Sequence, residues 1–191
     1  LNCGDVMQDA ALFYANKAKC PDFSLPEHFI LATLHRAENT DSPERLQSII
    51  AALEEIAREM PVVIPIHPRT RKKLQELNFD FKQTRLQLVD PVGYLEMVHL
   101  LKHCSLVATD SGGLQKEAYF FKKYCITLRT ETEWVELVEQ GANIITGWRY
   151  EDILNSYKQL KHTTKDVFSS PLYGDGQAGH IIIRELQRID S

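Results

Sequence analysis

Residues 106–121 read Leu-Val-Ala-Thr-Asp-Ser-Gly-Gly-Leu-Gln-Lys-Glu-Ala-Tyr-Phe-Phe. The first four residues form an apolar run of strand length, and a polar turn with two glycines follows. A helical pattern then covers residues 113–121. A strand followed directly by a helix is the unit from which parallel sheets with crossover helices are built. This stretch therefore predicts one βα unit of an α/β fold.

The same pattern recurs on both sides of this stretch. Five further apolar runs cover residues 29–34, 62–66, 86–89, 125–128 and 143–146, and helical patterns cover residues 43–60, 69–77 and 93–103. Ser42 before Pro43 marks a helix start, because serine caps unpaired N–H groups and proline suits the first helical position. The apolar runs are continuous rather than alternating, so both sheet faces are expected to be covered. The sequence predicts a doubly wound, Rossmann-like parallel sheet of about six strands.

Length and composition limit the possible classes of protein. The 191 residues, with a net charge of −4 and no basic tract, suit one globular domain and argue against a nucleic-acid partner. Four cysteines without metal-ligand spacing favour a reducing, cytoplasmic location. The apolar stretches are shorter than the ~20 residues that span a bilayer, so no membrane partner is expected. Because the chain begins with Leu1 rather than Met, we expect a piece of a longer protein.

Polar side chains follow four of the predicted strands. In chain order they are His35, Arg36, Glu38, Asn39, His67, Arg69, Asp110, Ser111, Arg129, Glu131 and Glu133. Since the carboxyl ends of parallel strands meet at one edge of a sheet, these side chains are expected to gather on one rim. The rim is the predicted functional site.

The turn Ser111-Gly112-Gly113 carries the most specific chemistry on this rim. Two glycines let the backbone approach a ligand closely, and the following helix presents unpaired N–H groups and its positive dipole end to an anion. Glu117 lies one turn further on, where its charge would repel a phosphate but suits the vicinal hydroxyls of a ribose. A phosphate and a ribose together predict a nucleotide.

Each of these features also has a simpler structural interpretation. Ser111 could be an ordinary helix cap, and a histidine after a strand is often a cap or a surface residue. Glu131 and Glu133 could form the acidic first turn of a helix. Trp134 and Trp148 are expected to be core or interface residues rather than stacking platforms. The expected gathering of the polar residues on one rim is what favours a functional site.

Six short motifs follow one another along the chain: His35-Arg-x-Glu-Asn39, Ile66-His67-Pro68, Asp90-Pro91-x-Gly93-Tyr94, Asp110-Ser-Gly-Gly-x-Gln-x-Glu-Ala118, Arg129-x-x-Thr-Glu133 and Gly174-Asp-Gly-x-Ala178. Together they resemble the non-hydrolysing UDP-N-acetylglucosamine 2-epimerase family, over nearly all 191 residues. The resemblance implies the C-terminal half of a two-domain, glycosyltransferase-B-type enzyme. Residues 1–22 would then be a linker and a helix arriving from the N-terminal domain, residues 23–174 the UDP-binding domain, and residues 175–191 a helix returning towards the N-terminal domain.

The resemblance also implies site residues. His35 matches the catalytic histidine near the glycosidic oxygen. Ser111, Gly112 and Gly113 match the β-phosphate contacts, and Glu117 matches the ribose ligand. Further UDP contacts are implied at Arg36, His67, Val92 and Met97. Neither a metal nor another cofactor is implied.

The implied reaction interconverts UDP-N-acetylglucosamine and UDP-N-acetylmannosamine by elimination and re-addition of UDP. The carboxylates that serve C2 lie on the N-terminal domain in the family, so the fragment alone is expected to be inactive. A homodimer is a further family expectation.

Two departures from the family pattern leave the exact sugar open. Trp134 stands where many members have arginine, and Met97 where they have phenylalanine. The Trp134 variant looks closer to members acting on UDP-2,3-diacetamido-2,3-dideoxy-glucuronic acid, which is the alternative substrate. Other readings are the C-terminal domain of a UDP-sugar glycosyltransferase and a nucleotide-binding module without catalysis.

Overall fold

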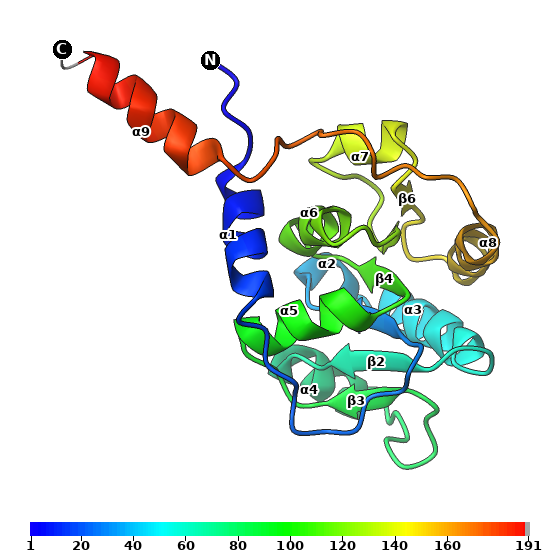
Figure 1. Ribbon diagram of the computed structural model, residues 1–191. Coiled ribbons are helices and arrows are strands. Elements are labelled where there is room, and N and C mark those ends of the chain that lie inside the picture. Colours follow the sequence, from blue (N-terminus) through cyan, green and yellow to red (C-terminus); the bar gives the residue numbers. More distant parts are fainter. Residues whose placement is uncertain (190–191) are drawn as a thin grey trace.

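The computed structural model describes residues 1–189, so residues 190 and 191 of the expected segment 175–191 lie outside the described residues. The elements in chain order are α1 (Val6–Ala15), β1 (Ile30–Thr33), α2 (Ala37–Thr40), α3 (Pro43–Ile56), β2 (Val62–Pro65), α4 (Pro68–Glu76), β3 (Gln87–Val89), α5 (Tyr94–His103), β4 (Leu106–Thr109), α6 (Gly112–Phe120), β5 (Cys125–Thr127), α7 (Val135–Glu139), β6 (Asn143–Ile145), α8 (Tyr150–Lys161) and α9 (Ala178–Ile189). Figure 1 shows their arrangement.

Within residues 1–189 the strands form one six-stranded sheet in the order β3-β2-β1-β4-β5-β6, with every neighbouring pair parallel. The register pairs Ile30 with Leu106 and Thr33 with Thr109, so β1 and β4 end at the same level. The strand order reverses between these two strands, and ligands of open parallel sheets bind beyond such a switch point. The predicted α/β fold class is confirmed.

The two faces of the sheet are covered by different helices, because successive strand residues point to opposite sides. Ile30 and Ala32 of β1 pack in one buried cluster with residues of α3, α4 and α8, whereas Leu31 packs in another with residues of α5 and α6. Burial stabilises each large apolar side chain, such as Leu53 or Leu101, by roughly 1.5–3 kcal/mol. The sheet is therefore doubly wound, as predicted.

Some local predictions were incomplete or wrong. Helix α3 begins at Pro43 with Ser42 as its cap, as predicted, but ends at Ile56 rather than near residue 60. Helices α2, α7 and α8 were not predicted. Glu131 and Glu133 do not form the first turn of a helix, since α7 begins at Val135. Instead, both carboxylates contact Arg129.

The segment before α1 and the segment before α9 cross in close contact. The Asp5 amide donates to the Tyr173 carbonyl at 2.8 Å, and Gly4 takes a φ of +86° where an added Cβ would lie 2.9 Å from that carbonyl oxygen. The Asp9 carboxylate of α1 accepts from the amides of Ala178 and Gly179, which caps the start of α9. This close crossing fixes where α1 and α9 begin.

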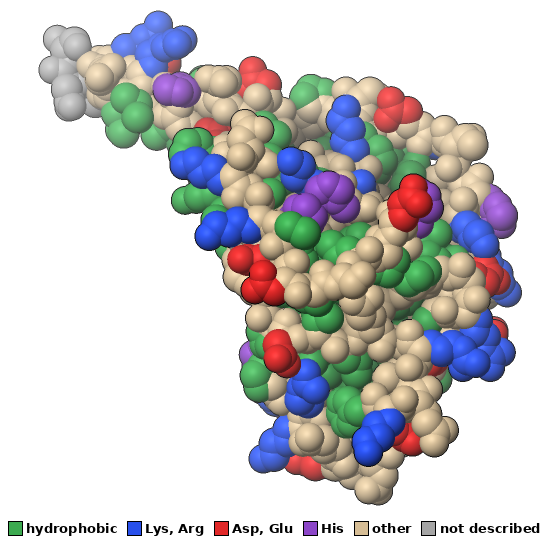
Figure 2. Space-filling model, turned by 60° about the horizontal axis from the view of Figure 1, so that its bottom comes forward, with side chains coloured by type: hydrophobic (Ala, Val, Ile, Leu, Met, Phe, Trp, Pro, Cys, Tyr) green, Lys and Arg blue, Asp and Glu red, His purple; other side chains and the backbone are tan. Residues whose placement is uncertain are grey.

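Helix α9 then projects from the body (Figures 1 and 2), and its side chains Ile183 and Leu186 are each 56% exposed. Among the described residues, none of the helices has the length and apolarity needed to cross a bilayer.

Candidate functional site

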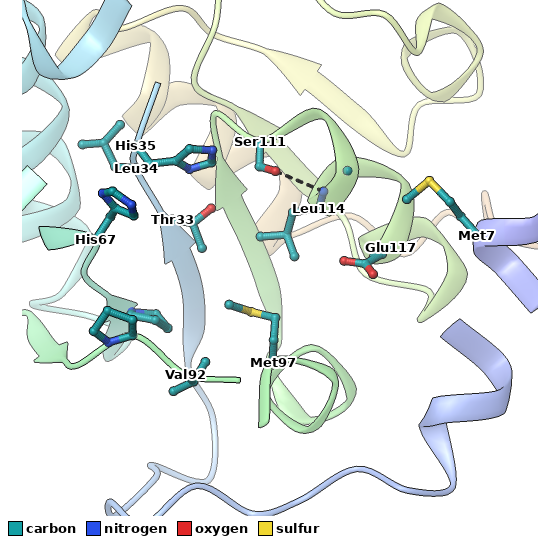
Figure 3. Close-up of a pocket in the computed structure, with 13 residues that line it drawn as sticks. Met7, Thr33, Leu34, His35, His67, Val92, Met97, Ser111, Leu114 and Glu117 are labelled. Atoms are coloured by element: carbon teal, nitrogen blue, oxygen red, sulfur yellow. Dashed lines mark hydrogen bonds between the residues drawn. The ribbon is translucent and has the colours of Figure 1, made fainter. Parts of the chain in front are cut away.

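A cavity of about 380 Å³ opens beyond the carboxyl ends of β1, β2 and β4 (Figure 3). Its walls include seven of the nine residues singled out in the sequence: His35, His67, Val92, Met97, Ser111, Gly113 and Glu117. The other two are not in its walls: Gly112 lies between the lining residues Ser111 and Gly113, and a Cβ added to Gly112 would be 3.8 Å from the Arg36 guanidinium. The structure thus gathers the predicted rim at the switch point of the sheet.

The anion cradle is the turn that leads into α6. The Ser111 hydroxyl caps the helix by accepting from the Leu114 amide at 3.4 Å. The N–H groups of Gly112 and Gly113 belong to the first helical turn, where helix geometry provides no carbonyl partner. A Cβ added to Gly113 would meet just the Met7 methyl at 3.9 Å, so this backbone stays open to the cavity. The capping role of Ser111 therefore leaves the amides of Gly112 and Gly113 without a helical carbonyl partner, as the predicted anion site requires.

Asp110 organises the loop that carries His35, although the sequence suggested no such role for it. Its carboxylate is buried and accepts from the amides of His35 (3.1 Å) and Arg36 (2.9 Å) and from the side-chain amide of Asn39 (3.2 Å). These bonds tie the end of β4 to the segment after β1. Since those partners are more than seventy residues away in sequence, the local pattern could not reveal them.

The two histidines of the cavity have different partners. His35 Nδ1 lies 3.3 Å from Asp110 Oδ1, which favours a proton on Nδ1 and leaves Nε2 available. His67 caps α4, because its Nδ1 accepts from the Arg69 amide at 3.2 Å. Their ring centroids are 6.4 Å apart, and His35 points towards Ser111 in Figure 3. His35 is thus the better oriented of the two for contact with a ligand in the cradle.

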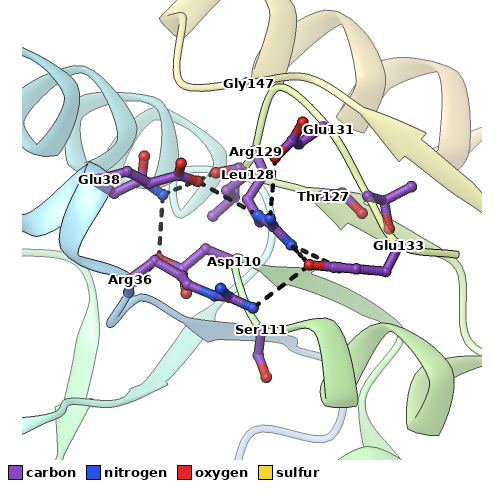
Figure 4. A network of polar contacts seen from close by, with 12 residues as sticks. Arg36, Glu38, Asp110, Ser111, Thr127, Leu128, Arg129, Glu131, Glu133 and Gly147 are labelled. Carbon is purple, nitrogen blue, oxygen red and sulfur yellow. Dashed lines mark hydrogen bonds and ion pairs between the residues drawn. The ribbon is translucent and has the colours of Figure 1, made fainter.

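An ionic cluster of Arg36, Glu38, Arg129, Glu131 and Glu133 borders the cradle (Figure 4). Arg129 is buried, and its guanidinium lies 2.8 Å from Glu133, 3.5 Å from Glu38 and 3.9 Å from Glu131. Its hydrogen bond lowers the pKa of the Glu133 carboxyl, which in turn lies 4.0 Å from Arg36. The cluster holds Arg36 next to Gly112 while balancing the charge of the buried arginine.

Glu117 lies in the cavity wall one turn beyond the cradle. Burial raises the pKa of its carboxyl, and a hydrogen bond from the Tyr94 hydroxyl, 3.0 Å long, opposes that rise. On the far side, Val92 and Met97 pack against the apolar cluster of α5 and α6. The cavity therefore combines a polar anion end, a carboxylate and an apolar wall.

Trp134 packs against the turn that forms the cradle. The sequence predicted a core or interface residue, and the side chain is half-buried. Its indole N–H donates to the Gly112 carbonyl at 2.8 Å, and the Lys116 ammonium lies 4.1 Å from its ring centroid. Lys116 also pairs with Asp5 at the start of α1. Sequence reasoning missed Lys116, whose position within α6 gave no sign of a buried ion pair.

Comparison with known proteins identifies the relatives of this chain. A family model described as UDP-N-acetylglucosamine 2-epimerase matches residues 1–187. A UDP-2,3-diacetamido-2,3-dideoxy-D-glucuronate 2-epimerase from Pseudomonas aeruginosa is 50% identical, over 99% of this chain and 53% of its own length. A UDP-N-acetylglucosamine 2-epimerase from Methanocaldococcus jannaschii is 40% identical, over 85% of this chain and 45% of its own length.

The fold agrees with these relatives. The crystal structure of Methanocaldococcus jannaschii UDP-GlcNAc 2-epimerase in complex with UDP-GlcNAc and UDP superposes with a TM-score of 0.86 and 36% identity. The match covers 97% of this chain and 54% of that one, so the chain spans about half the length of the relatives it matches. The predicted resemblance to one half of a two-domain enzyme is confirmed. The chain belongs to the UDP-N-acetylglucosamine 2-epimerase family.

Proposed function

We propose that this chain is the UDP-binding half of a UDP-sugar 2-epimerase and that UDP lies in the cavity at the strand ends. The observation that carries this proposal is the common cavity of the Gly113 backbone and the Glu117 carboxylate, one helical turn apart. Amides suit the β-phosphate and a carboxylate suits the ribose hydroxyls. The relative solved with UDP-GlcNAc and UDP supports the same ligand class.

This half would hold the leaving group of the reaction. A base takes the proton from C2, the C1–O bond breaks, and UDP departs to leave a 2-acetamidoglycal. Re-addition of UDP to C1 with a proton delivered to the opposite face of C2 gives the epimer. The helix N-terminus at Gly112 and Gly113 stabilises the negative charge that develops on the departing diphosphate, and His35 Nε2 is available for a hydrogen bond to the glycosidic oxygen.

The N-terminal half of the relatives would supply the base at C2. Two features of this chain support such a partner domain. Its first and last segments cross at Gly4 and Tyr173, as two connections to one neighbouring domain would. Helix α9 leaves this crossing with Ile183 and Leu186 exposed, which suits packing on another domain. The proposed division keeps residues 1–22 and 175–191 as the connecting segments around the domain of residues 23–174.

The sugar we propose is UDP-2,3-diacetamido-2,3-dideoxy-glucuronate, in place of UDP-N-acetylglucosamine, the first expectation from the sequence. The support is the 50% identity to the epimerase for the diacetamido sugar, against 40% to the Methanocaldococcus UDP-N-acetylglucosamine 2-epimerase.

Proton exchange tests the proposal. This domain is joined to the N-terminal half of the Pseudomonas relative and, separately, to that of the Methanocaldococcus relative, so that a preference shared by both proteins comes from this domain. Both should introduce deuterium at C2 of the diacetamido sugar in heavy water, with a kcat/KM about tenfold or more above that for UDP-N-acetylglucosamine. The chain alone, as the control, should give no exchange because it lacks the base. Mass spectrometry and NMR measure the label. A preference for UDP-N-acetylglucosamine would contradict the proposed sugar, and transfer of the sugar to an acceptor without exchange would indicate a glycosyltransferase.

Glu117→Gln should weaken UDP binding by about tenfold, because a charged hydrogen bond to the ribose is lost. The same change should raise the thermal stability of the unliganded chain at neutral pH. A carboxyl whose pKa is raised in the folded state stabilises the fold at low pH, and that contribution is lost as pH rises through the raised pKa. The glutamine amide does not titrate, so the variant should not lose stability between low and neutral pH as the wild-type chain does.

Calorimetry with UDP and thermal scans at pH 5 and pH 8 measure both effects of this substitution. Glu139→Gln, which makes the same charge change at an exposed position of α7, is the matched control and should alter neither. Unchanged UDP affinity would reject Glu117 as the ribose ligand.

A further inference from the structure

Tyr94 joins two helices at the ribose end of the cavity. It is the first residue of α5, and its hydroxyl donates to Oε1 of Glu117 on α6 over 3.0 Å. These helices follow β3 and β4 and pack on the same face of the sheet. The contact therefore links the segment that carries Val92 to the helix that begins at the anion cradle.

A carboxylate that binds a vicinal diol must be ionised and held in one orientation. An ionised carboxylate offers about four lone-pair sites, so one hydrogen bond from Tyr94 leaves the others for ligand hydroxyls. Burial raises the pKa of Glu117 and so favours the neutral form, whereas the Tyr94 hydrogen bond favours the charged form. The Tyr94 hydrogen bond thus favours both the ionised form and one orientation of the Glu117 carboxylate.

Tyr94 is itself held as a donor. Its ring packs edge-on against Tyr14 of α1, with centroids 5.5 Å apart and ring planes at 87°. Tyr94 is 43% exposed, and partial desolvation together with the neighbouring Glu117 raises the pKa of its hydroxyl to about 12, further above neutral pH than that of an ordinary tyrosine. The contact with α1 holds the ring, and the hydroxyl is directed at Glu117.

We propose that Tyr94 is a positioning residue for ribose recognition, whose hydroxyl fixes the Glu117 carboxylate so that its remaining lone pairs face the ribose hydroxyls of UDP. This role rests on the proposed function, since it takes Glu117 as the ribose ligand. Tyr94 acts on the ligand through Glu117 and not directly. Removing its hydroxyl should therefore weaken only the part of the UDP affinity that comes from the ribose hydroxyls.

The test compares UDP with 2′-deoxy-UDP on the purified chain by calorimetry. Tyr94→Phe should weaken UDP about three- to tenfold and 2′-deoxy-UDP much less, so the preference for the ribonucleotide narrows. In a Glu117→Ala background, Tyr94→Phe should have no further effect on UDP. Tyr14→Phe is the matched control, because it removes a hydroxyl from the neighbouring ring and keeps the ring contact; both affinities should stay at the wild-type values.

Three results would overturn this role. Equal weakening of both nucleotides by Tyr94→Phe would mean that the residue acts through the fold. Unchanged UDP affinity would mean that the hydrogen bond does not orient Glu117. Absence of UDP binding to the unaltered chain would reject the proposed function itself, and the role of Tyr94 with it.

Discussion

Gly113→Val should weaken UDP binding by about 100-fold or more, because the side chain would occupy the space in front of the cradle amides. A Cβ at this position meets one atom within 4 Å, the Met7 methyl at 3.9 Å, and the position lines the cavity. The substitution therefore fills the ligand's space rather than the core. Since valine also has a better helix propensity than glycine, the fold should keep its stability.

Calorimetry with UDP and a thermal scan separate binding from folding in this variant. Ala51→Val on the exposed face of α3 is the control for a valine in a helix away from the cavity, and it should bind UDP normally. UDP affinity within twofold of wild type for a folded Gly113→Val chain would place the diphosphate somewhere other than the start of α6.

Asp110→Ala should lower the free energy of unfolding by roughly 3 kcal/mol or more, because buried hydrogen bonds to a charged group contribute about 1.5–3 kcal/mol each. The substitution leaves the amides of His35 and Arg36 and the Asn39 side chain without this acceptor. UDP affinity should fall as well, since the loop that carries His35 loses its attachment to β4.

Urea unfolding measures this change as a shift of the midpoint at constant slope. Asp90→Ala is the control, since that carboxylate is 92% exposed and pairs with Arg71 at the surface; its midpoint should stay near the wild-type value. An Asp110→Ala midpoint equal to that of Asp90→Ala would show that Asp110 is not the link between β1 and β4.

The four central strands β1, β2, β4 and β5 could be predicted because each is a run of residues buried on both sides of the sheet, whereas the edge strands β3 and β6 are only partly buried. Four consecutive buried residues, as in β1 and β4, appear in the sequence as a continuous, largely apolar run. Helix α8 also buries an apolar stripe, Ile153, Leu154, Tyr157 and Leu160, so its signal was present and overlooked. Helix α2 spans four residues, too few for a periodic pattern.

The candidate site was predictable where its residues follow strands, because parallel topology brings strand ends together. This rule predicted His35, His67 and Ser111, which line the cavity, whereas Val92 and Met97 were expected only from the family resemblance. Contacts that depend on the strand order were not predictable: Asp110 reaches His35 because β4 lies next to β1. The pairing of Lys116 with Asp5 likewise depends on where α1 packs.

We propose that the backbone amides at the start of α6 hold the diphosphate of UDP. Amide NMR of the nitrogen-15-labelled chain during a UDP titration tests it most directly. We expect the largest shift changes at the amides of Gly112, Gly113 and Leu114 and smaller changes at His35 and Glu117. Uridine, which lacks the phosphates, should shift the cradle amides least. Largest changes at a different cavity, such as the one lined by Cys20, Arg71 and Glu96, or no saturable change, would contradict it.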